Sequence, residues 1–517
     1  MKKEFFVLTS LLIASCSQAG SDISSSAPAA PSTASEAATY YIDASAGSDA
    51  NDGLTETSPW QTLDKASQVK LKAGDRMLLK AGTVFNGVLE LCGKGSSNKR
   101  IEVGRYGEGN APKIVGHDNA DYAVRILNSE YLTISGLEIV NTGSQRKAGR
   151  TGLKVECLDY GVSRSISVSN LFIHDVNGSL VKEQGGGSAI LIVNHGKSVA
   201  SRFDSLTIEN CHIKDCARNA MIWSGHYDRR DWLPSTNVVV RGNLIEGVPG
   251  DGIVPIGCDG TLIEYNVMRD CPDMLPMTEA AAGIWPWSCD NTVIQFNEVS
   301  GHKAPWDAQG YDCDYNCRNT LIQYNYSHDN YGGMVLICDS GNERNYSLGN
   351  KGSRVRYNIS IGDGQRPKAT RQGMFSPNIH IAGRVEDTTV ERNIIHSNTK
   401  TTADADRTMV CSDSWDGFAD RTTFKENIFY TSEPSRFDMN ASTHNDFQGN
   451  WYLGLYANLP ADSQARKSST TYQSRIVDAD PMGFKALERL MDKRTTCGAE
   501  CHFVNKELIE KFFAEMD

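Results

Sequence analysis

Apolar and polar residues alternate in short runs along most of the chain, and many of these runs lead into an asparagine. Aligned on that asparagine, eight of the runs form one column with intervals of 23 to 35 residues. The column consists of Asn243, Asn266, Asn297, Asn325, Asn358, Asn393, Asn427 and Asn450. Glycine-led runs follow, such as residues 251–254 (DGIV), 282–285 (AGIW) and 332–335 (GGMV). The alternation predicts short β-strands separated by turns.

Short strands that recur about every 30 residues predict an all-β fold, a parallel β-helix of ten to twelve coils over residues 39–480. A β-sandwich would instead need hairpin turns. In a β-helix each coil buries its apolar side against its neighbours, and equivalent side chains stack. A stacked column of asparagines forms a ladder of amide hydrogen bonds, so we assign these asparagines a structural role.

The opening of the repeat region resembles a known family. Residues 39–66 (TYYIDASAGSDANDGLTETSPWQTLDKA) and 73–91 (AGDRMLLKAGTVFNGVLEL) are similar to the start of the secreted right-handed parallel β-helix (pectate-lyase-like) superfamily. That superfamily contains polysaccharide lyases and glycoside hydrolases. The resemblance covers residues 39–480 and implies the fold together with either of the two chemistries.

The two ends of the chain differ from the repeat. Residues 1–15 have two lysines and then an apolar run too short to span a bilayer, which predicts a lipoprotein signal peptide with Cys16 as the lipidated residue. Residues 16–38 are rich in serine and lack aromatic residues, as expected of a flexible tether. We therefore expect a lipid-anchored protein of the bacterial cell envelope. Residues 481–517 predict a helical extension, with an amphipathic helix over 506–516.

The amino-acid composition limits the kinds of ligand and partner that the protein can bind. The 517 residues include 52 basic and 63 acidic side chains, a net charge of -11 without a basic stripe, which argues against nucleic acid. Export permits disulfides among the fourteen cysteines, and the local pairs Cys211/Cys216 and Cys497/Cys501 are the simplest to propose. No CxxC pair supports zinc. We expect a monomer that acts on a polysaccharide or oligosaccharide.

Chemistry-bearing residues gather in the central coils, residues 220–345. Aligning 283–289 (GIWPWSC), 310–316 (GYDCDYN) and 333–339 (GMVLICD) on their small first residue places Asp312 after Trp285 and Asp314 after Trp287. Two charges stacked in an apolar core would be costly, so these side chains are expected to face outwards. Aromatic rings beside paired carboxylates are typical of sugar binding and acid–base chemistry.

Loops around these strands add further candidates. The catalytic candidates are Asp312, Asp314, Asp339, Asp307, His226 and His328. The candidate substrate-binding residues are Trp285, Trp287, Trp223, Lys303, Arg230 and Arg318. Each also has a structural explanation: the aspartates can serve a salt bridge or a structural ion, the tryptophans can lie under a loop, and the histidines can belong to turns.

Three functions remain open on the sequence alone. A glycoside hydrolase needs two carboxyl groups across the bond, which Asp312 and Asp314 can supply without a cofactor. A polysaccharide lyase would use a basic residue, with Ca²⁺ held by Asp312 and Asp314. A non-catalytic glycan-binding lipoprotein would need aromatic residues without an acidic cluster. Because no lysine lies on the aligned strand face, hydrolysis is favoured over elimination.

Overall fold

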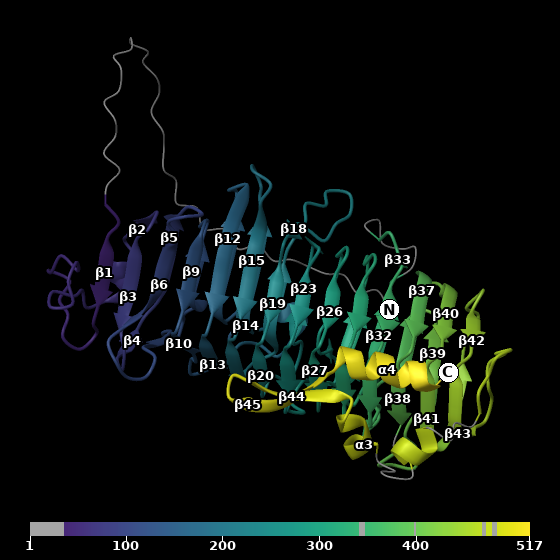
Figure 1. Ribbon diagram of the computed structural model, residues 1–517. Coiled ribbons are helices and arrows are strands. Elements are labelled where there is room, and N and C mark those ends of the chain that lie inside the picture. Colours follow the sequence, from purple (N-terminus) through teal and green to yellow (C-terminus); the bar gives the residue numbers. More distant parts are fainter. Residues whose placement is uncertain (1–35, 341–346, 398–399, 468–471, 478–482, 517) are drawn as a thin grey trace.

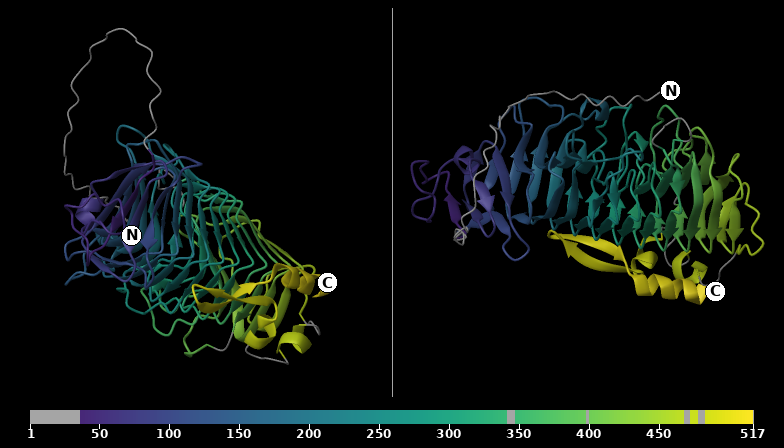
Figure 2. Two further views of the ribbon diagram at one scale, coloured as in Figure 1. Left: turned by 60° about the vertical axis from the view of Figure 1, so that its left-hand side comes forward. Right: turned by 90° about the horizontal axis from the view of Figure 1, so that it is seen from above.

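The structure is a computed structural model that describes residues 36–340, 347–397, 400–467, 472–477 and 483–516. It is a single long coil of parallel strands, with three faces that run the length of the molecule (Figures 1 and 2). The predicted signal peptide and Cys16 lie outside the described residues. None of the helices in the described part of the chain is long and apolar enough to cross a membrane.

The first face is built from parallel strands that pair coil to coil. Its strands are β1 (Thr39–Ile42), β3 (Arg76–Lys80), β6 (Ile101–Tyr106), β9 (Leu132–Ser135), β12 (Val162–Ser169), β15 (Arg202–Glu209), β18 (Ser235–Thr236), β19 (Val239–Arg241), β22 (Cys258–Asp259), β23 (Leu262–Glu264), β26 (Val293–Gln295), β30 (Leu321–Gln323), β33 (Asn350–Lys351), β34 (Arg354–Arg356), β37 (Val385–Glu391), β40 (Asp420–Lys425) and β42 (Asp446–Gln448).

The second face follows the asparagine corner and is an unbroken series of parallel pairings. Its strands are β4 (Val84–Asn86), β7 (Lys113–Val115), β10 (Glu138–Asn141), β13 (Phe172–Val176), β16 (His212–Cys216), β20 (Leu244–Glu246), β24 (Val267–Arg269), β27 (Glu298–Ser300), β31 (Tyr326–His328), β35 (Ile359–Ile361), β38 (Ile394–Ser397), β41 (Ile428–Asp438) and β43 (Trp451–Tyr456).

The third face carries the glycine-led strands. Isolated β-bridges from Ile284 to Ile253 and to Tyr311 join its N-terminal half to its C-terminal half. Its strands are β2 (Lys70–Lys72), β5 (Leu89–Lys94), β8 (Tyr122–Leu127), β11 (Thr151–Leu158), β14 (Ser188–His195), β17 (Asn219–Ser224), β21 (Ile253–Val254), β29 (Tyr311–Cys313), β32 (Val335–Cys338), β36 (Ile379–Ala382) and β39 (Thr408–Asp413). Beside it, β25 (Ala280–Ala281) pairs with β28 (Trp306–Asp307).

The predicted asparagine ladder is confirmed. Oδ1 of Asn297 accepts hydrogen bonds from the backbone N–H and from Nδ2 of Asn266 at 2.9 and 3.0 Å, and Asn297 donates the same pair to Asn325. The ladder ends where Asn450 donates to Asp462. Every ladder asparagine is buried, so these hydrogen bonds replace those lost to water. The second face has thirteen strands in the described part of the chain, slightly more than the ten to twelve coils predicted. The prediction was low because the N-terminal coils lack the asparagine on which the repeat was aligned.

Beside the ladder runs a stack of aromatic rings. Tyr265, Phe296, Tyr324 and Tyr357 each precede a ladder asparagine with a φ of 52 to 56°, and adjacent rings stack at 5.2 to 5.4 Å. The C-terminal segment packs on this stack, and the ring of Phe513 meets Tyr357 edge-on at 6.0 Å. The stack therefore shows where the C-terminal extension docks (Figure 2).

The predicted C-terminal helix is confirmed as α4 (Lys506–Met516), whose apolar side is buried. An antiparallel hairpin that the sequence pattern did not predict precedes it. The remaining elements are α1 (Leu63–Ala66), η1 (Lys182–Gln184), η3 (Gln473–Val477), α3 (Phe484–Glu488) and the hairpin strands β44 (Met491–Thr496) and β45 (Ala499–Val504).

Both predicted disulfides are wrong in this structure, since all thirteen cysteines of the described residues are free. Cys211 and Cys216 are buried in the coil, where their thiols donate to the carbonyls of Glu209 and Lys214. Cys501 faces the buried side of the hairpin, whereas Cys497 is exposed at its turn. Close spacing therefore does not bring these thiols together, because strand and turn geometry directs them apart.

Candidate active site

The strand register places the predicted acids beside the predicted tryptophans. Asp312 follows Tyr311, which pairs with Ile284, so Asp312 stands beside Trp285 on the next coil. The backbone N–H of Asp314 donates to the carbonyl of Pro286 at 3.2 Å, which places Asp314 beside Trp287. The third face thus brings two carboxyl groups and two indole rings onto adjoining coils.

One coil further on, the sequence alignment is wrong by one residue. It predicts Val335 and Ile337 beside the two aspartates, but the register pairs Asp312 with Leu336 and Cys313 with Ile337. The alignment took Gly333 as the equivalent of Gly310, whereas the structure pairs Tyr311 with Val335. Leu336 and Cys338 therefore form an apolar floor next to the aspartates.

Asp312 is almost completely enclosed, with 4% of its surface exposed. Burial raises the pKa of Asp312 well above its ordinary value, and the charges of Asp307 and Asp314 raise it further. Its Oδ1 has no hydrogen-bond partner among the described residues. Burial and the two acidic neighbours therefore both favour the neutral, protonated form of this carboxyl group.

Asp314 is half-buried and keeps better hydrogen bonds. Burial raises its pKa to about 6, against the lowering effect of hydrogen bonds from the Cys338 thiol, at 3.2 Å, and from the backbone N–H of Tyr315. The positive charge of Lys182 also lowers the pKa, and Asp307 raises it. Asp314 can therefore exchange a proton near neutral pH, as an acid–base group must.

Asp307 reaches the same site from the short strand β28 rather than from the third face. Asp307 and the next residue, Ala308, both have left-handed backbone angles, with φ of 59 and 64°. Arg366 holds this segment by donating to the carbonyls of Pro305 and Asp307 at 2.6 and 3.1 Å. Gly332 is required beneath it, because a Cβ there would lie 2.2 Å from the Asp307 carbonyl oxygen. Such conformational cost is typical of functional sites.

A buried ionic cluster fixes Trp285. Its indole N–H donates to Oδ1 of Asp251 at 3.1 Å, and Oδ2 of Asp251 accepts from Arg218 at 2.5 Å. Arg218 also binds Glu279, at 3.2 Å, and neither Arg218 nor Asp251 is exposed. Burial raises the pKa of Asp251, but Arg218 and Lys182 outweigh it and the net pKa is lowered. Lys182 lies 5.2 Å above the indole ring.

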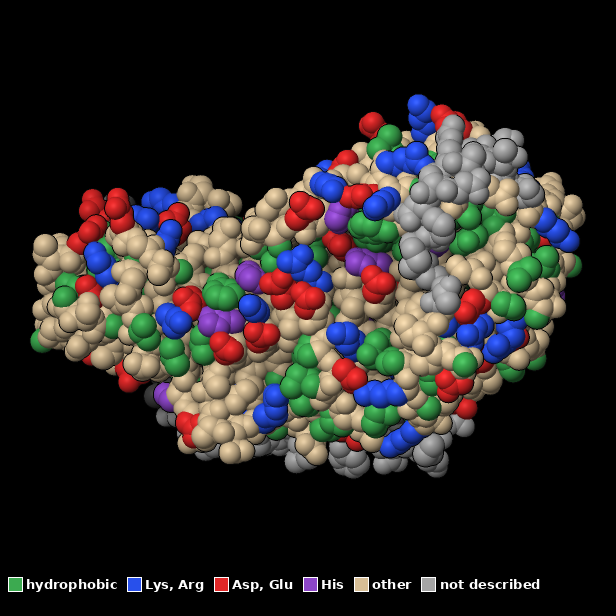
Figure 3. All heavy atoms as spheres, turned by 90° about the horizontal axis from the view of Figure 1, so that it is seen from below, with side chains coloured by type: hydrophobic (Ala, Val, Ile, Leu, Met, Phe, Trp, Pro, Cys, Tyr) green, Lys and Arg blue, Asp and Glu red, His purple; other side chains and the backbone are tan. Residues whose placement is uncertain are grey.

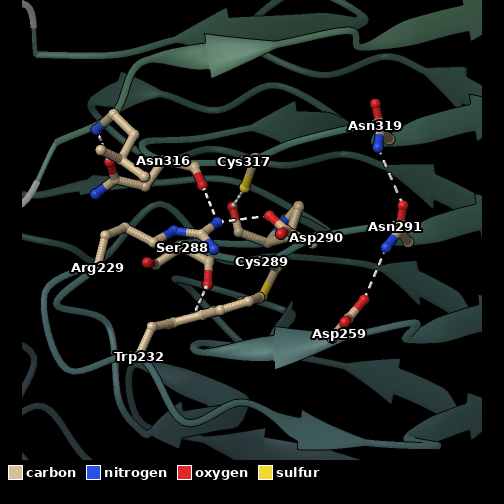
Figure 4. A network of polar contacts seen from close by, with 12 residues as sticks. Arg229, Trp232, Asp259, Ser288, Cys289, Asp290, Asn291, Asn316, Cys317 and Asn319 are labelled. Carbon is tan, nitrogen blue, oxygen red and sulfur yellow. Dashed lines mark hydrogen bonds and ion pairs between the residues drawn. The ribbon is translucent and has the colours of Figure 1, made fainter.

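Trp287 is packed against the loop at 225–234, which the sequence proposed as part of the site and whose Arg229 and Trp232 are shown in Figure 4. Tyr227 of this loop stacks on Trp287 with ring centres 5.1 Å apart. Arg229 reaches across to bind Asp290 at 2.7 Å and the backbone carbonyl of Asn316. The loop is thereby fastened to two later coils and forms one wall beside the tryptophans.

Several sequence candidates lie elsewhere. Trp223 is 1% exposed and points into the core, since the strand alternation turns Ile222 outwards instead. Arg230 is exposed on the loop at 225–234, where it forms an ion pair with Asp228. Arg318 belongs to the corner next to the first face, where its backbone bridges Asp290. The charge of Lys303 acts on the buried thiol of Cys271.

The histidine candidates are also apart from the aspartates. His328 lies on β31 of the second face, where it binds Asp329 at 2.8 Å and Glu298 at 3.3 Å. Burial favours its neutral form, but these two partners raise its pKa to about 9. Figure 3 shows histidines interspersed with charged side chains on the underside of the coil. His226 is bound to the carbonyl of Ser201 at 3.1 Å.

Asp339 follows β32 but turns away from the other carboxyl groups. Its two oxygens accept hydrogen bonds from the backbone N–H of Asn316, at 2.9 Å, and from the hydroxyl of Ser347, at 2.6 Å. The side chain is completely buried. It therefore braces the turn that follows β32.

A pocket beside Asp307 contains residues that the sequence analysis did not select. It is lined by Asp307, Gln309, Arg366, Phe375, His380 and Trp415, among others. His380 belongs to the outward column that begins with Trp285 and Asp312, two coils after Asp312. Extending the strand alignment to β36 in the correct register would have identified it. No group of three or more metal-ligating side chains with suitable geometry occurs in the described part of the chain.

Comparisons with known proteins agree with this architecture. A family model described as "Right handed beta helix region" matches residues 188–370. The crystal structure of a GH136 lacto-N-biosidase from Eubacterium ramulus superposes with a TM-score of 0.55 at 23% identity, covering 79% of this chain and 67% of that one. The fold is the right-handed parallel β-helix.

A curated relative extends the comparison to sequence. The lacto-N-biosidase of Bifidobacterium longum subsp. longum is 27% identical over 530 residues, covering 83% of this chain. The chain spans about a third of that relative's length, 31%. The match includes the central coils because it extends over most of the chain.

Proposed function

We propose that this protein is a glycoside hydrolase that cleaves an oligosaccharide or polysaccharide. The observation that carries the proposal is the convergence of Asp307, Asp312 and Asp314 on one site, where the charge of Asp307 raises the pKa of both Asp312 and Asp314. Glycosidases use two carboxyl groups in opposite protonation states. The lacto-N-biosidase names of the two relatives support the same reaction class.

The catalytic roles of the three aspartates follow from how accessible each side chain is to a substrate. Asp314 and Asp307 are half-buried, so a sugar can reach both, whereas Asp312 is enclosed. We assign the reacting pair to Asp307 and Asp314, with Asp314 as the proton-exchanging group because its pKa is about 6. Burial and its acidic neighbours favour the neutral form of Asp312, so we assign it no charged role. Trp287 is partly exposed and can contact a sugar ring, whereas Trp285 is buried.

The test is a panel of p-nitrophenyl glycosides that includes the lacto-N-bioside, assayed with the full chain. Asp307→Asn and Asp314→Asn keep side-chain shape but remove the carboxylate. Each should lower kcat/KM by about a hundredfold or more, the scale of a lost acid–base group. Asp64→Asn, at an exposed position of α1 far from the site, is the matched control and should leave kcat/KM unchanged. Full activity in both site variants would refute the assignment.

The same assay separates hydrolysis from elimination. A lyase acting on uronic acids produces an unsaturated product that absorbs near 235 nm, and a hydrolase does not. Arg230 forms an ion pair with Asp228 on the outer loop, which does not favour it as the base of a lyase. Absorbance at 235 nm during digestion of a uronate polysaccharide would favour the lyase instead.

We further propose that the protein is exported and held at the bacterial cell envelope by a lipid on Cys16. The support is the signal-like residues 1–15 and the serine-rich tether at 16–38. Cys16→Ala should release the protein from the membrane fraction. Because the tether precedes β1, the variant should keep its activity and its melting temperature. Unchanged membrane retention would refute lipidation at Cys16.

A further inference from the structure

One oxygen of Asp314 is held by the protein and the other is not. Oδ1 accepts a hydrogen bond from the thiol of Cys338 at 3.2 Å and another from the backbone N–H of Tyr315 at 2.6 Å. No hydrogen bond joins Oδ2 to another of the described residues, and the side chain is half-buried. Oδ1 is therefore fixed in place, whereas Oδ2 is left to meet a ligand.

The strand register explains how Cys338 reaches Asp314. β29 pairs with β32 so that Cys313 lies opposite Ile337, and the next residues on the two coils are Asp314 and Cys338. Side chains at equivalent positions of stacked parallel strands meet one another. Cys338 is 1% exposed, so its thiol is directed at the carboxyl group and not at solvent.

A thiol suits this position because it donates a hydrogen bond and also tolerates apolar surroundings. Cys338 packs in an apolar cluster with Leu336 and Ala382. Burial raises the pKa of Cys338 well above its ordinary value, and the charges of Asp314 and Asp312 raise it further. The thiol therefore stays protonated and acts as a hydrogen-bond donor, not as a nucleophile.

We propose that Cys338 is a positioning residue, whose thiol fixes Oδ1 of Asp314 so that Oδ2 is the oxygen that reacts with the substrate. The inference rests on the proposed function for the reaction at Oδ2, and not for the contact between the two side chains. Both hydrogen bonds to Oδ1 come from the protein itself, so the carboxyl group is oriented before a substrate arrives.

The ionisable groups around Asp314 come from four elements. Asp307 of β28 raises its pKa, whereas Lys182 of η1 lowers it. Asp312 of β29 also lies near, since its own pKa is raised by Asp314. Among the contacts that lower the pKa of Asp314, the hydrogen bond from Cys338 of β32 has the largest effect. Removing this thiol should therefore change both the orientation of the carboxyl group and its affinity for a proton.

Thermal unfolding of the full chain at pH 5 and pH 8 tests the contact without catalysis. Cys338→Ala should raise the pKa of Asp314 by roughly half to one unit, the scale of one hydrogen bond. Because a folded-state pKa above the unfolded value costs stability as the pH rises, the melting temperature should fall about 1 °C further between pH 5 and pH 8 than in the parent. In the Asp314→Asn background this extra fall should vanish.

Two control variants accompany this experiment. Cys338→Ser keeps a hydrogen-bond donor and should match the parent at both pH values. Cys216→Ala removes a buried thiol that donates to the backbone carbonyls of Ile173 and Lys214, so its effect on the melting temperature should be the same at both pH values.

Kinetics separate positioning from packing. On a glycoside that the parent hydrolyses, Cys338→Ala should lower kcat about tenfold and leave KM within about twofold, because Cys338 acts through Asp314 and is itself enclosed. The limb of the pH–rate profile that reports Asp314 should move to higher pH by the same half to one unit, roughly. Cys338→Ser should recover most of kcat.

The outcomes separate the two proposals. Equal pH dependence of melting in the parent and in Cys338→Ala overturns the role of Cys338, and so does a Cys338→Ser variant that behaves like Cys338→Ala. If Cys338→Ala does not fold, infrared spectra of the unmodified chain decide: one S–H stretching band must shift as Asp314 titrates, and constant bands overturn the inference. The expected melting behaviour without hydrolysis of any glycoside keeps the contact and loses the proposed function. Hydrolysis with unchanged kcat in Cys338→Ala does the reverse.

Discussion

Asp314→Asn should inactivate the protein and also stabilise it at neutral and alkaline pH. In the folded chain the pKa of Asp314 is about 6, against 3.8 in an unperturbed aspartate. The folded state therefore holds the proton more tightly than the unfolded state. Between pH 3.8 and 6 the folded carboxyl group is still protonated while the unfolded one is not, so the free energy of unfolding falls as the pH rises.

The size of the effect follows from the two pKa values. The difference corresponds to at most about 3 kcal/mol at pH 7 and above, and to roughly half of that at pH 5. Asparagine can still accept the hydrogen bonds from Cys338 and Tyr315, so the variant should regain most of this energy. For a chain of this length, about 3 kcal/mol raises the melting temperature by about 3 °C.

The assay is thermal unfolding followed by circular dichroism at pH 5 and pH 8. The variant should melt higher than the parent at pH 8, and its advantage should shrink at pH 5. Asp228→Asn is the control, because its pKa is lowered by Arg230 and its removal should bring no gain. A variant that melts lower than the parent at pH 8, or whose advantage does not depend on pH, would refute the reasoning.

Two further predictions concern the scaffold. Asn297→Ala leaves the backbone N–H and Nδ2 of Asn266 without their acceptor in a buried ladder, so unfolding should become easier by about 3 kcal/mol. Asn291→Ala, in the exposed row of Figure 4, should cost under about 1 kcal/mol in the same melting experiment, and equal losses would contradict a structural ladder. His328→Gln should leave activity unchanged but lower the melting temperature, since the pKa of His328 is raised to about 9. The stabilisation by His328 is complete below pH 6.5 and disappears as the pH rises to 9. The difference in melting temperature between the parent and His328→Gln should therefore shrink as the pH rises, and a difference that grows would contradict the argument.

The scaffold could be predicted because its signal repeats. Ladder asparagines such as Asn297 and Asn325 recur with the coil, and every coil repeats the same burial pattern. The α4 helix could be predicted from its own apolar side. The hairpin before it could not, because its residues pack on the aromatic stack of distant coils and carry little pattern of their own.

The candidate site was only partly predictable. Asp312, Asp314 and the two tryptophans follow the coil repeat of the third face, so alignment placed them on adjoining coils, although Asp312 and Trp285 are buried rather than exposed. The positions of Gln309 and His380 at the site depend on how three loops fold over one another. Two glycines are adjacent at 332–333, so the alignment was shifted by one residue and His380 was not recognised as part of the column with Asp312. Trp223 was assigned to the surface by residue type, although strand alternation directs it into the core.

The most direct test of the central claim follows the oxygen of water into the product. The protein is incubated with a cleavable glycoside in water enriched in oxygen-18, and the released sugars are analysed by mass spectrometry. Hydrolysis at Asp307 and Asp314 adds one labelled oxygen to the sugar that gains the reducing end, and both Asp→Asn variants should release almost none. Products without label, carrying the double bond of an elimination, would contradict the account.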